Sequence, residues 1–308
     1  MASRPAGGPP GMLELRIASI GYGSVESIPV YHYMPGHTAT RLVVPGVEEA
    51  LYHCEGHPTC QYGRGAKAFE AAPVPLKAVI ARARIWGTPI LFLDGPEPLA
   101  QLGEEGLREL LRTARQAGLR VGARSLGLAP SSLLEQVDFL VIDYVREYAL
   151  DPSLHGEALL ALKQVKDRVW VEVAAYLEEP RLDPLHPLLL ALEGSRVPLH
   201  VYVRKHLGGG PVRDLYQELS RRLPYVYIHN DLYPYLDTNC PKCGSPIASR
   251  DEGLLRVLEL RDGKCWKCGA PLDFRGPVRK KTPVQVQVTA REGGVVWYHP
   301  SSLVRKPY

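Results

Sequence analysis

The sequence predicts an α/β protein: a partial (βα)6 TIM-like barrel followed by a C-terminal zinc ribbon and a β-hairpin tail. Three observations lead to this fold class. Short apolar runs alternate with segments of helical periodicity between residues 76 and 228. Two Cys-x-x-Cys pairs follow this repeat, and a valine-rich stretch interrupted by Gly-Gly comes last. Successive apolar runs begin roughly 20 to 30 residues apart, which is the length of one βα unit.

The composition is ordinary for a globular protein. Of the 308 residues, 45% are hydrophobic and 23% are charged, which allows a substantial buried core. Residues 1–12 are rich in Pro and Gly without an apolar core, so we expect a disordered lead and not a signal peptide. No apolar run is long enough to span a bilayer. Four of the six cysteines lie in the two Cys-x-x-Cys pairs, which favours metal binding in a reducing cytoplasm over a disulfide scaffold.

We assign residues 13–235 to the partial barrel and expect its elements in the following order. Alternating apolar residues over 13–17 predict an entry strand, and Arg41–Val44 predicts a second strand. The helix–strand pairs that follow are 76–86 with 89–93, 104–117 with 119–123, 131–136 with 138–143, 154–166 with 169–175, 184–192 with 199–203, and 212–222 with 225–228. Strands joined by helices run parallel, so functional loops are expected at their carboxyl ends. A doubly wound sheet is the structural alternative.

Four cysteines define the next domain, residues 236–276. Cys240 and Cys243 form one pair, Cys265 and Cys268 form the other, and 21 residues separate the pairs. This spacing is typical of structural zinc sites, because four thiolates satisfy a tetrahedral Zn²⁺ ion without redox chemistry. A closed four-sulfur site has no open position for substrate, so it should stabilise the fold and take no part in chemistry. Two disulfides or free thiols are the alternative.

Residues 277–308 are expected to form a basic β-hairpin tail. Alternating Val and Gln over 284–288 precede Gly293-Gly294 and a second apolar stretch, which is a hairpin signal. From Arg275 to the end, seven basic residues stand against one acid, a net charge of +6; the whole chain carries +4, so residues 1–274 carry −2. An anionic partner such as RNA suits this tail, although a solvated tail without a partner is the commoner case.

One loop of the repeat is dense in metal ligands. After the Arg41–Val44 strand, two Cys and two His fall within eight residues, namely His53, Cys54, His57 and Cys60. Chance rarely gives such a density of imidazole and thiol ligands. A His-rich exposed loop is the alternative interpretation.

The loop after the next strand holds Asp94, Gly95, Pro96 and Glu97. A glycine at this position permits close approach of the backbone to a ligand, and Glu97 suits a ligand ammonium group. Taken alone, the same residues are also typical of a simple turn.

These two loops, their order on the repeat and the ribbon behind them resemble the radical S-adenosylmethionine superfamily. Within that superfamily the chain resembles the AmmeMemoRadiSam-type proteins, which are related to pyruvate formate-lyase activating enzymes. The resemblance covers about residues 28–275, and the segments that carry it are Tyr31–Gly36, Asp94–Pro98, Ala114–Leu119, Phe139–Asp143, Trp170–Val173 and Tyr225–Asn230.

The resemblance implies that S-adenosylmethionine binds at the barrel mouth, with Asp94, Gly95 and Glu97 at the position that receives the methionine amino group. It also implies an iron–sulfur cluster in the preceding loop. Family members hold this cluster through Cys-x-x-x-Cys-x-x-Cys, and this chain has no such triplet. One alignment places His53, His57 and Cys60 at the three ligand positions. We therefore expect an altered cluster there, or a single Zn²⁺ or Fe ion that Cys54 also helps to hold.

The resemblance thus implies a radical SAM-like protein that binds S-adenosylmethionine at a modified iron–sulfur or metal site, an oxidoreductase or activase if it is active. The alternative is a catalytically degenerate protein of the same fold that serves as a binding module for a protein or RNA partner. A third hypothesis is an RNA- or ribosome-associated factor that uses the ribbon and Arg279-Lys280-Lys281. The sequence identifies neither catalytic residues nor a substrate.

Overall fold

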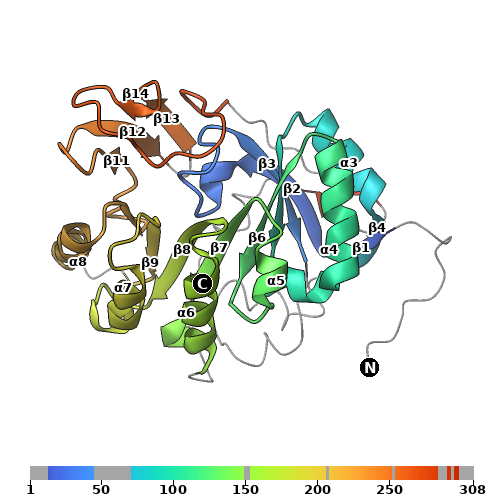
Figure 1. The fold of residues 1–308 in the computed structure, drawn as a ribbon, viewed down its shortest axis with the longest axis horizontal. Coiled ribbons are helices and arrows are strands. Elements are labelled where there is room, and N and C mark those ends of the chain that lie inside the picture. Colours follow the sequence, from blue (N-terminus) through green and yellow to red (C-terminus); the bar gives the residue numbers. More distant parts are fainter. Residues whose placement is uncertain are drawn as a thin grey trace.

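The main element of the protein is a ten-stranded sheet (Figure 1). The structure is a computed structural model that describes residues 13–44, 71–148, 153–205, 208–251, 254–283, 290–292 and 295–297. From one edge to the other, the strands of this sheet are β10 (Val226–His229), β9 (Leu199–Val203), β8 (Trp170–Leu177), β7 (Phe139–Tyr144), β6 (Arg120–Ser125), β5 (Ile90–Asp94), β3 (Thr38–Val43), β2 (Ser19–Ser24), β17 (Val295–Trp297) and β16 (Ala290–Glu292).

The strands from β3 to β10 are parallel, and their order in the sheet is their order in the chain. The predicted α/β class with a large parallel sheet is therefore confirmed. The doubly wound alternative is wrong, because such a sheet reverses its strand order at a switch point and this one does not. Within the described residues β10 and β16 form the two edges of the sheet, which remains open.

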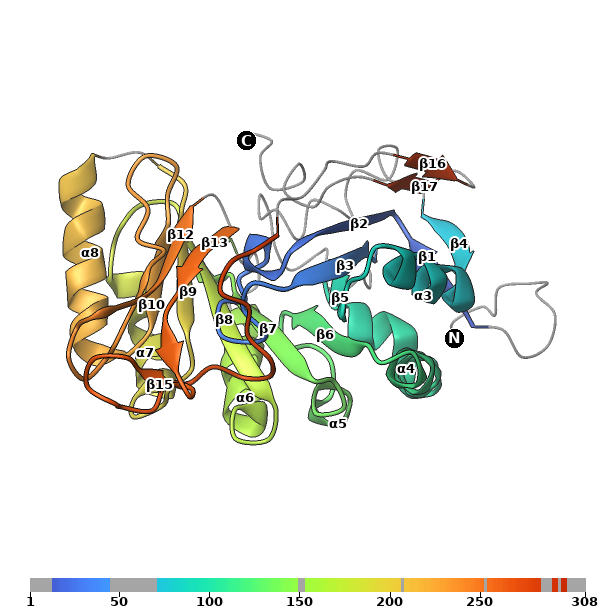
Figure 2. The same cartoon turned by 90° about the horizontal axis from the view of Figure 1, so that it is seen from above.

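Helices cover one side of the parallel strands. They are α3 (Leu76–Ile85), α4 (Pro98–Gln116), α5 (Ser131–Leu134), α6 (Ser153–Val165), α7 (His186–Leu192) and α8 (Gly209–Arg222). Figure 2 shows them along the outer side of the curved sheet. The apolar face of α4 illustrates the packing, because Leu107, Leu110 and Leu111 share one buried cluster with Leu91 and Leu93 of β5. A further antiparallel pair, β1 (Glu14–Ile17) with β4 (Ala72–Pro75), lies beside α3.

The other, concave side of the sheet is filled by residues 25–37, the segment between β2 and β3, which we call the plug. Val25, Ile28 and Val30 of the plug belong to a buried cluster that includes Phe92 and Phe139 of the sheet. At Gly122 of β6, a Cβ atom would lie 2.1 Å from the Phe139 ring, so this position requires glycine. Apolar side chains therefore fill the concave face near the amino-terminal ends of the strands. The polar residues described below lie near the carboxyl-terminal ends.

The cysteine-containing domain lies against the plug. It consists of a three-stranded antiparallel sheet and a short pair, with strands β11 (Thr238–Asn239), β12 (Pro246–Asp251), β13 (Leu254–Leu258), β14 (Leu260–Arg261) and β15 (Lys264–Cys265). Arg275 N donates to His32 O at 2.8 Å, and Met34 N donates to Arg275 O at 2.8 Å. The Arg250 guanidinium stacks over the Tyr31 ring at 4.1 Å and donates to the Tyr31 carbonyl. The domain thus holds the plug from the side opposite the sheet.

The described part of the tail forms a hairpin. β16 and β17 pair antiparallel, and β17 adds to the main sheet by pairing parallel with β2. This pair lies at the far end of the sheet from the ribbon (Figure 2). The predicted pairing partner 284–288 lies outside the described residues. Within the described residues no helix combines the length and the apolar character needed to cross a membrane.

The lowered pKa of His32, a residue of the plug, leads us to predict a specific pH dependence of the unfolding free energy. Burial lowers the pKa of His32 to about 4, and an unfolded histidine titrates near 6.5. Below pH about 6.5 the unfolded chain binds a proton that the folded chain does not, so stability falls as the pH decreases toward 4. This group alone should remove about 2 kcal/mol of unfolding free energy between pH 7 and pH 5.

The measurement is urea unfolding of the unmodified protein and of His32→Asn at both pH values. The variant should be less stable throughout but should lose less free energy between pH 7 and pH 5. His186→Asn, at an exposed position, is the matched control and should keep the original slope. An identical pH slope in His32→Asn would contradict the assignment.

Candidate functional site

Polar side chains occupy the carboxyl ends of five neighbouring parallel strands on the concave face. They are Arg41 of β3, Asp94 of β5, Arg124 of β6, Asp143 of β7 and Tyr176 of β8. All are buried. The period of two along each strand explains their common direction: Phe92 packs into the concave cluster, and Asp94 follows it on the same face. The functional edge of a (βα) sheet is this carboxyl edge.

These groups form one ion network. Arg124 Nε lies 2.7 Å from Asp94 Oδ1, and Arg124 Nη1 lies 2.8 Å from Asp143 Oδ1. Arg41 Nε donates to the second Asp94 oxygen. Arg124 Nη1 is also 2.9 Å from the Tyr176 hydroxyl, which lies 3.2 Å from Asp143. Two guanidiniums and two carboxylates therefore neutralise each other out of contact with water.

The two carboxyl groups respond differently to their surroundings. Burial alone would raise the pKa of Asp94, but the Arg41 and Arg124 guanidiniums together outweigh it and hold this pKa below its usual range. Burial raises the pKa of Asp143, and the Arg124 guanidinium only partly offsets the effect. Asp94 is therefore the anion that fixes both arginines, and Asp143 is the member of the network closest to accepting a proton.

Arg41 has one donor to spare. Its side chain is only 5% exposed, and its Nη1 atom is buried without a hydrogen-bond partner in the part of the chain that the structure describes. A buried guanidinium N–H without an acceptor is costly, so such an atom indicates where an oxygen of a bound molecule can be accommodated. Arg124 Nε is also without a hydrogen bond of good geometry, but it lies 2.7 Å from Asp94 Oδ1, whereas Arg41 Nη1 has no carboxylate partner in the described residues.

The loop at Asp94–Pro98 is held by the protein itself. Gly95 has φ of 110°, and a Cβ atom there would lie 2.1 Å from the Val44 carbonyl oxygen. The close approach that the glycine permits is therefore to β3 and not to a ligand. Glu97, with φ of 55°, is fully buried and accepts hydrogen bonds from Ser125 Oγ at 2.7 Å and from Leu126 N at 2.8 Å.

Further backbone donors reach Glu97 from the turn after β6, including Leu128 N at 3.1 Å. Burial raises the pKa of Glu97, and these hydrogen bonds act against that shift. In this arrangement the carboxylate stabilises the 126–129 turn, and a ligand ammonium would have to displace a protein donor to reach it. The cofactor-binding role that the sequence analysis assigned to Asp94, Gly95 and Glu97 stays a prediction.

The predicted metal loop leaves the sheet at this same edge. Val43 pairs with Asp94 in the register of β3 and β5, and Val44 N donates to Asp94 O at 2.9 Å. Val44, the last described residue before position 45, therefore lies beside the ion network. His53, Cys54, His57 and Cys60 themselves lie outside the described residues.

The four cysteines of the ribbon do converge. Cys240, Cys243, Cys265 and Cys268 have their sulfur atoms all within 4.8 Å of one another. Sγ–Sγ distances of 3.7 Å join Cys240 to Cys268 and Cys243 to Cys265. A tetrahedral ion with bonds of about 2.3 Å to sulfur requires edges of roughly 3.8 Å, so the four positions fit one metal ion.

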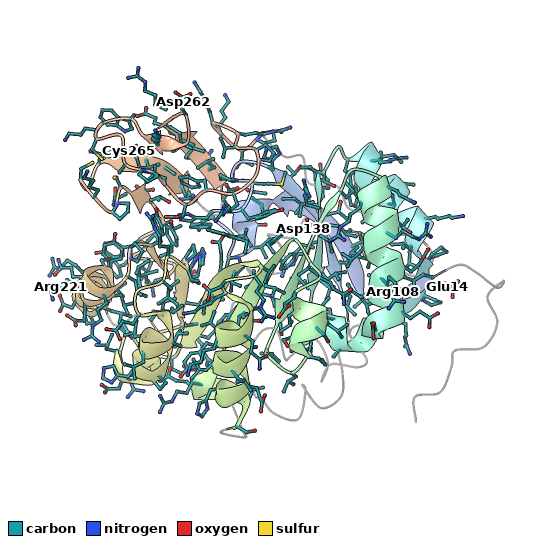
Figure 3. All side chains as sticks on the ribbon, in the orientation of Figure 1. Glu14, Arg108, Asp138, Arg221, Asp262 and Cys265 are labelled. Atoms are coloured by element: carbon teal, nitrogen blue, oxygen red, sulfur yellow. The ribbon has the colours of Figure 1, made fainter. Side chains whose placement is uncertain are left out.

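The thiols of this cluster differ in pKa. Although a backbone hydrogen bond at Ala270 acts against the shift, burial and hydrogen bonds with the neighbouring thiols raise the pKa of Cys268 to about 11. A hydrogen bond with the Ser245 hydroxyl, 3.3 Å from the sulfur, lowers the pKa of Cys243 to about 6. Gly244 and Gly269 follow the two pairs with φ of 70°, and their N–H groups donate back to the carbonyls of Cys240 and Cys265. Cys265 lies in the small domain, remote from the α4 helix (Figure 3).

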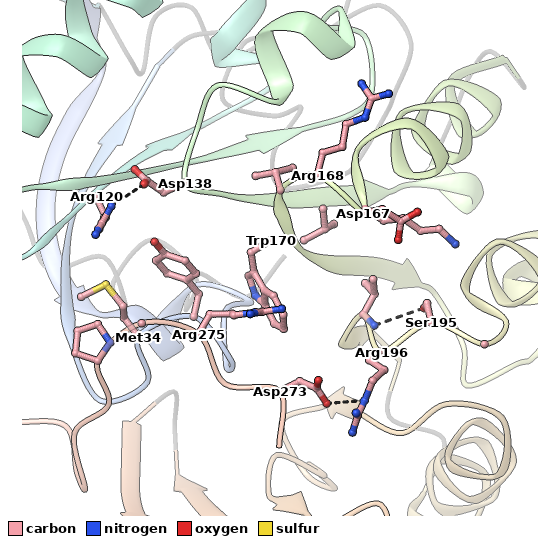
Figure 4. A pocket seen from close by; sticks show the side chains of 18 residues that line it. Met34, Arg120, Asp138, Asp167, Arg168, Trp170, Ser195, Arg196, Asp273 and Arg275 are labelled. Carbon is pink, nitrogen blue, oxygen red and sulfur yellow. Dashed lines mark hydrogen bonds and ion pairs between the residues drawn. The ribbon is translucent and has the colours of Figure 1, made fainter. Parts of the chain in front are cut away.

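A groove lies at the opposite, amino-terminal edge of the strands (Figure 4). It has a volume of about 690 Å³ and lies between the starts of β6 and β8 and the end of the ribbon. Two ion pairs lie in its lining: Arg120 with Asp138 at 3.2 Å, and Arg196 with Asp273 at 2.7 Å. Lys166, Asp167 and Arg275 also line the groove, so the two ion pairs do not account for all of its charged residues.

Sequence reasoning missed Arg41, Arg124 and Tyr176 as site residues. A usable signal was present, because each arginine stands inside an apolar strand at an inward position, where an unpaired charge is rarely tolerated. Asp143 was singled out only through the family resemblance of its strand.

The fold and the site define an α/β protein with an open, sequentially ordered parallel sheet, a buried ion network at its carboxyl edge and a four-cysteine metal-binding module. No protein-family model matches the chain, and no curated protein does. Among solved structures the chain is similar to the crystal structure of archaeal TYW1, at 12% identity over 63% of this chain and 75% of that chain, with a TM-score of 0.39. A similarity this low carries no argument about family or activity.

The metal-binding role of the cysteines can be tested by substitution. Cys243→Ser should remove about one equivalent of bound metal per chain and make residues 238–282 sensitive to limited proteolysis, because metal binding supplies folding free energy in small modules. Elemental analysis of protein purified without chelators gives the metal content. Lys242→Ser, at an exposed position between the two cysteines of the same pair, is the matched control and should keep all of the bound metal. Equal metal content in Cys243→Ser and the control would show that the cluster binds none.

The ion network predicts a large cost for removing its central cation. Arg124→Met leaves Asp94 and Asp143 buried with fewer partners and should lower the unfolding free energy by about 3 to 5 kcal/mol. Arg108→Met removes an ion pair with Glu104 on the outer face of α4 (Figure 3) and should change stability too little to measure. Urea unfolding at pH 7 compares the two. A small loss in Arg124→Met would mean that the network contributes little.

Proposed function

We propose that this protein binds S-adenosylmethionine at the carboxyl edge of its parallel strands, as a radical SAM-like protein with a modified metal site and a structural zinc ion. The observation that carries the proposal is the spare Nη1 donor of Arg41, buried beside the Asp94–Pro98 loop. The ligand brings an α-carboxylate, and a carboxylate is the group that a guanidinium N–H binds best. A buried, pre-arranged donor gains more from such a contact than an exposed one does.

The network residues have separate tasks in this proposal. Asp94 orients the Arg41 guanidinium through Nε and leaves Nη1 for the ligand carboxylate. Arg124 fixes Asp94, and Asp143 fixes Arg124 from the next strand. The geometry is therefore set before a ligand arrives, which reduces the entropy lost on binding. When bound, S-adenosylmethionine supplies an electrophilic sulfonium centre.

The residues available do not fit the usual iron–sulfur cluster of the family. Such a cluster takes three thiolates, and outside the ribbon the sequence offers only Cys54 and Cys60. Imidazole ligands raise the potential of iron–sulfur centres, whereas reductive cleavage needs a strongly reducing electron. We derive no radical step. For His53, Cys54, His57 and Cys60 we propose a single metal ion, a site that two imidazoles and two thiolates are suited to form.

For the ribbon we propose Zn²⁺. Four cysteine sulfurs within 4.8 Å of one another, two pairs of them 3.7 Å apart, suit its tetrahedral preference, and the closed set leaves no position for substrate. The ion would stabilise the module that holds the plug through Arg250 and Arg275.

The ligand proposal is tested by calorimetric titration with S-adenosylmethionine. Arg41→Lys keeps a positive charge beside Asp94 but removes Nη1, and it should weaken binding about ten-fold or more. 5′-Methylthioadenosine, which lacks the carboxylate, should bind the variant and the unmodified protein equally. Arg108→Lys is the control for an exposed exchange. No binding to the unmodified protein, or equal binding to Arg41→Lys, would refute the proposal.

A further inference from the structure

Three side chains outside the ion network form a second polar chain on the concave face. Glu172 of β8, His200 of β9 and His229 of β10 come from neighbouring strands. His200 Nε2 lies 3.0 Å from Glu172 Oε2, and His200 Nδ1 lies 3.0 Å from His229 Nε2. Glu172 lies near the start of β8, and His229 is the last residue of β10. This row of hydrogen-bonded side chains therefore extends from the packed interior to the carboxyl edge.

The inner end of this chain can only accept hydrogen bonds. Glu172 is fully buried and receives Tyr31 N on Oε2 at 2.8 Å, with His32 N on Oε1 at 2.9 Å and Tyr33 N on Oε1 at 3.2 Å. The Trp170 indole N–H donates as well, at 3.2 Å. A carboxylate that accepts this many N–H groups is held as an acceptor. His200 must therefore carry its proton on Nε2.

The tautomer of His200 determines the tautomer of His229. A neutral imidazole with Nε2–H has a lone pair on Nδ1, so His200 Nδ1 accepts from His229 Nε2–H. His229 in turn has its lone pair on Nδ1. That atom makes no hydrogen bond within the described residues, and His229 is only half-buried, whereas His200 is fully buried. The chain thus presents one unprotonated ring nitrogen at the outer end.

The surroundings keep both rings neutral and fixed. Burial lowers the pKa of His229 well below its usual value, with further lowering by His200 and by Arg250. The ring of His229 stacks on Tyr202 with centroids 4.1 Å apart, and Tyr202 stacks on Tyr176 at 5.0 Å. Tyr176 is itself bonded to Arg124. His229 therefore lies at the same edge as the ion network.

We propose that His229 Nδ1 is the proton acceptor of this site, acting on a hydroxyl or protonated amine of the molecule bound at the carboxyl edge, with Glu172 and His200 as its positioning residues. In that step the proton leaves the ligand oxygen or nitrogen, which keeps the bonding electron pair, and joins Nδ1. The Nε2–H of His229 stays in its hydrogen bond to His200. Glu172, through His200, holds the His229 ring in the tautomer that leaves Nδ1 free to accept. The inference does not require that the ligand be S-adenosylmethionine.

The test reads the tautomers directly by NMR of protein labelled with ¹⁵N-histidine, at pH 7.5. In the unmodified protein His200 and His229 should both be Nε2–H tautomers. In Glu172→Gln the amide NH₂ replaces the oxygen that faces His200 Nε2, so both rings should reverse to Nδ1–H. His32 is the internal control: its Nδ1 donates to the Asp273 carbonyl and its Nε2 faces the Tyr227 hydroxyl, so its tautomer should not change.

Accessibility of the acceptor is tested with diethylpyrocarbonate, an electrophile that reacts with unprotonated ring nitrogens. Mass spectrometry should find His229 modified in the unmodified protein, several-fold slower modification in Glu172→Gln, and no modification of His200. An Nδ1–H tautomer of His229 in the unmodified protein, or an unreactive His229, would overturn the proposal. If Glu172→Gln does not fold, the tautomer and the reactivity of the unmodified protein decide the question alone.

Discussion

The interior of this protein depends on the hydrogen bonds between the buried Glu172 carboxylate and the plug backbone. An open parallel sheet leaves its concave face without helices, and here the plug fills it. The plug backbone over residues 31–33 has no sheet partner for its N–H groups, and Glu172 accepts all three of them. One carboxylate on a strand thus accepts the hydrogen bonds that a neighbouring strand would otherwise accept. Each buried N–H left without an acceptor would cost about 1 to 3 kcal/mol of stability.

The plug also connects the main sheet to the cysteine-containing domain. On one side it rests on the sheet, and on the other it is held by Arg250 and Arg275 of the cysteine domain. Metal binding at the ribbon therefore stabilises more than the ribbon, because the ordered ribbon covers the plug and the plug orders the concave face. The ribbon and the groove beside it lie at the amino-terminal edge, opposite the carboxyl edge that holds the ion network.

At that edge two systems of different character lie side by side. The ion network around Arg124 is neutral overall and rigid, and it leaves one donor on Arg41. The histidine chain ends in one acceptor on His229. A cationic donor and a neutral acceptor within one concave face are suited to a ligand that carries both an anionic group and a protic group. The stacked Tyr176 and Tyr202 rings join the two systems.

The sequence by itself determined the alternation of strands and helices and the paired cysteines, because apolar periodicity and the spacing of cysteines are local properties of the chain. It leaves the order of the strands in the sheet open between two alternatives, and only the tertiary structure decided it. It also singled out the 94–98 loop, but not what the loop contacts. Only the tertiary structure decided that Glu97 is occupied by the 126–129 turn, and that Gly95 makes room for Val44. Burial and pairing of charges depend on which strands become neighbours. The contacts of Arg124 with Asp143, of Glu172 with His200 and of His200 with His229 join residues 19 to 29 positions apart, and no local pattern in the sequence encodes such contacts.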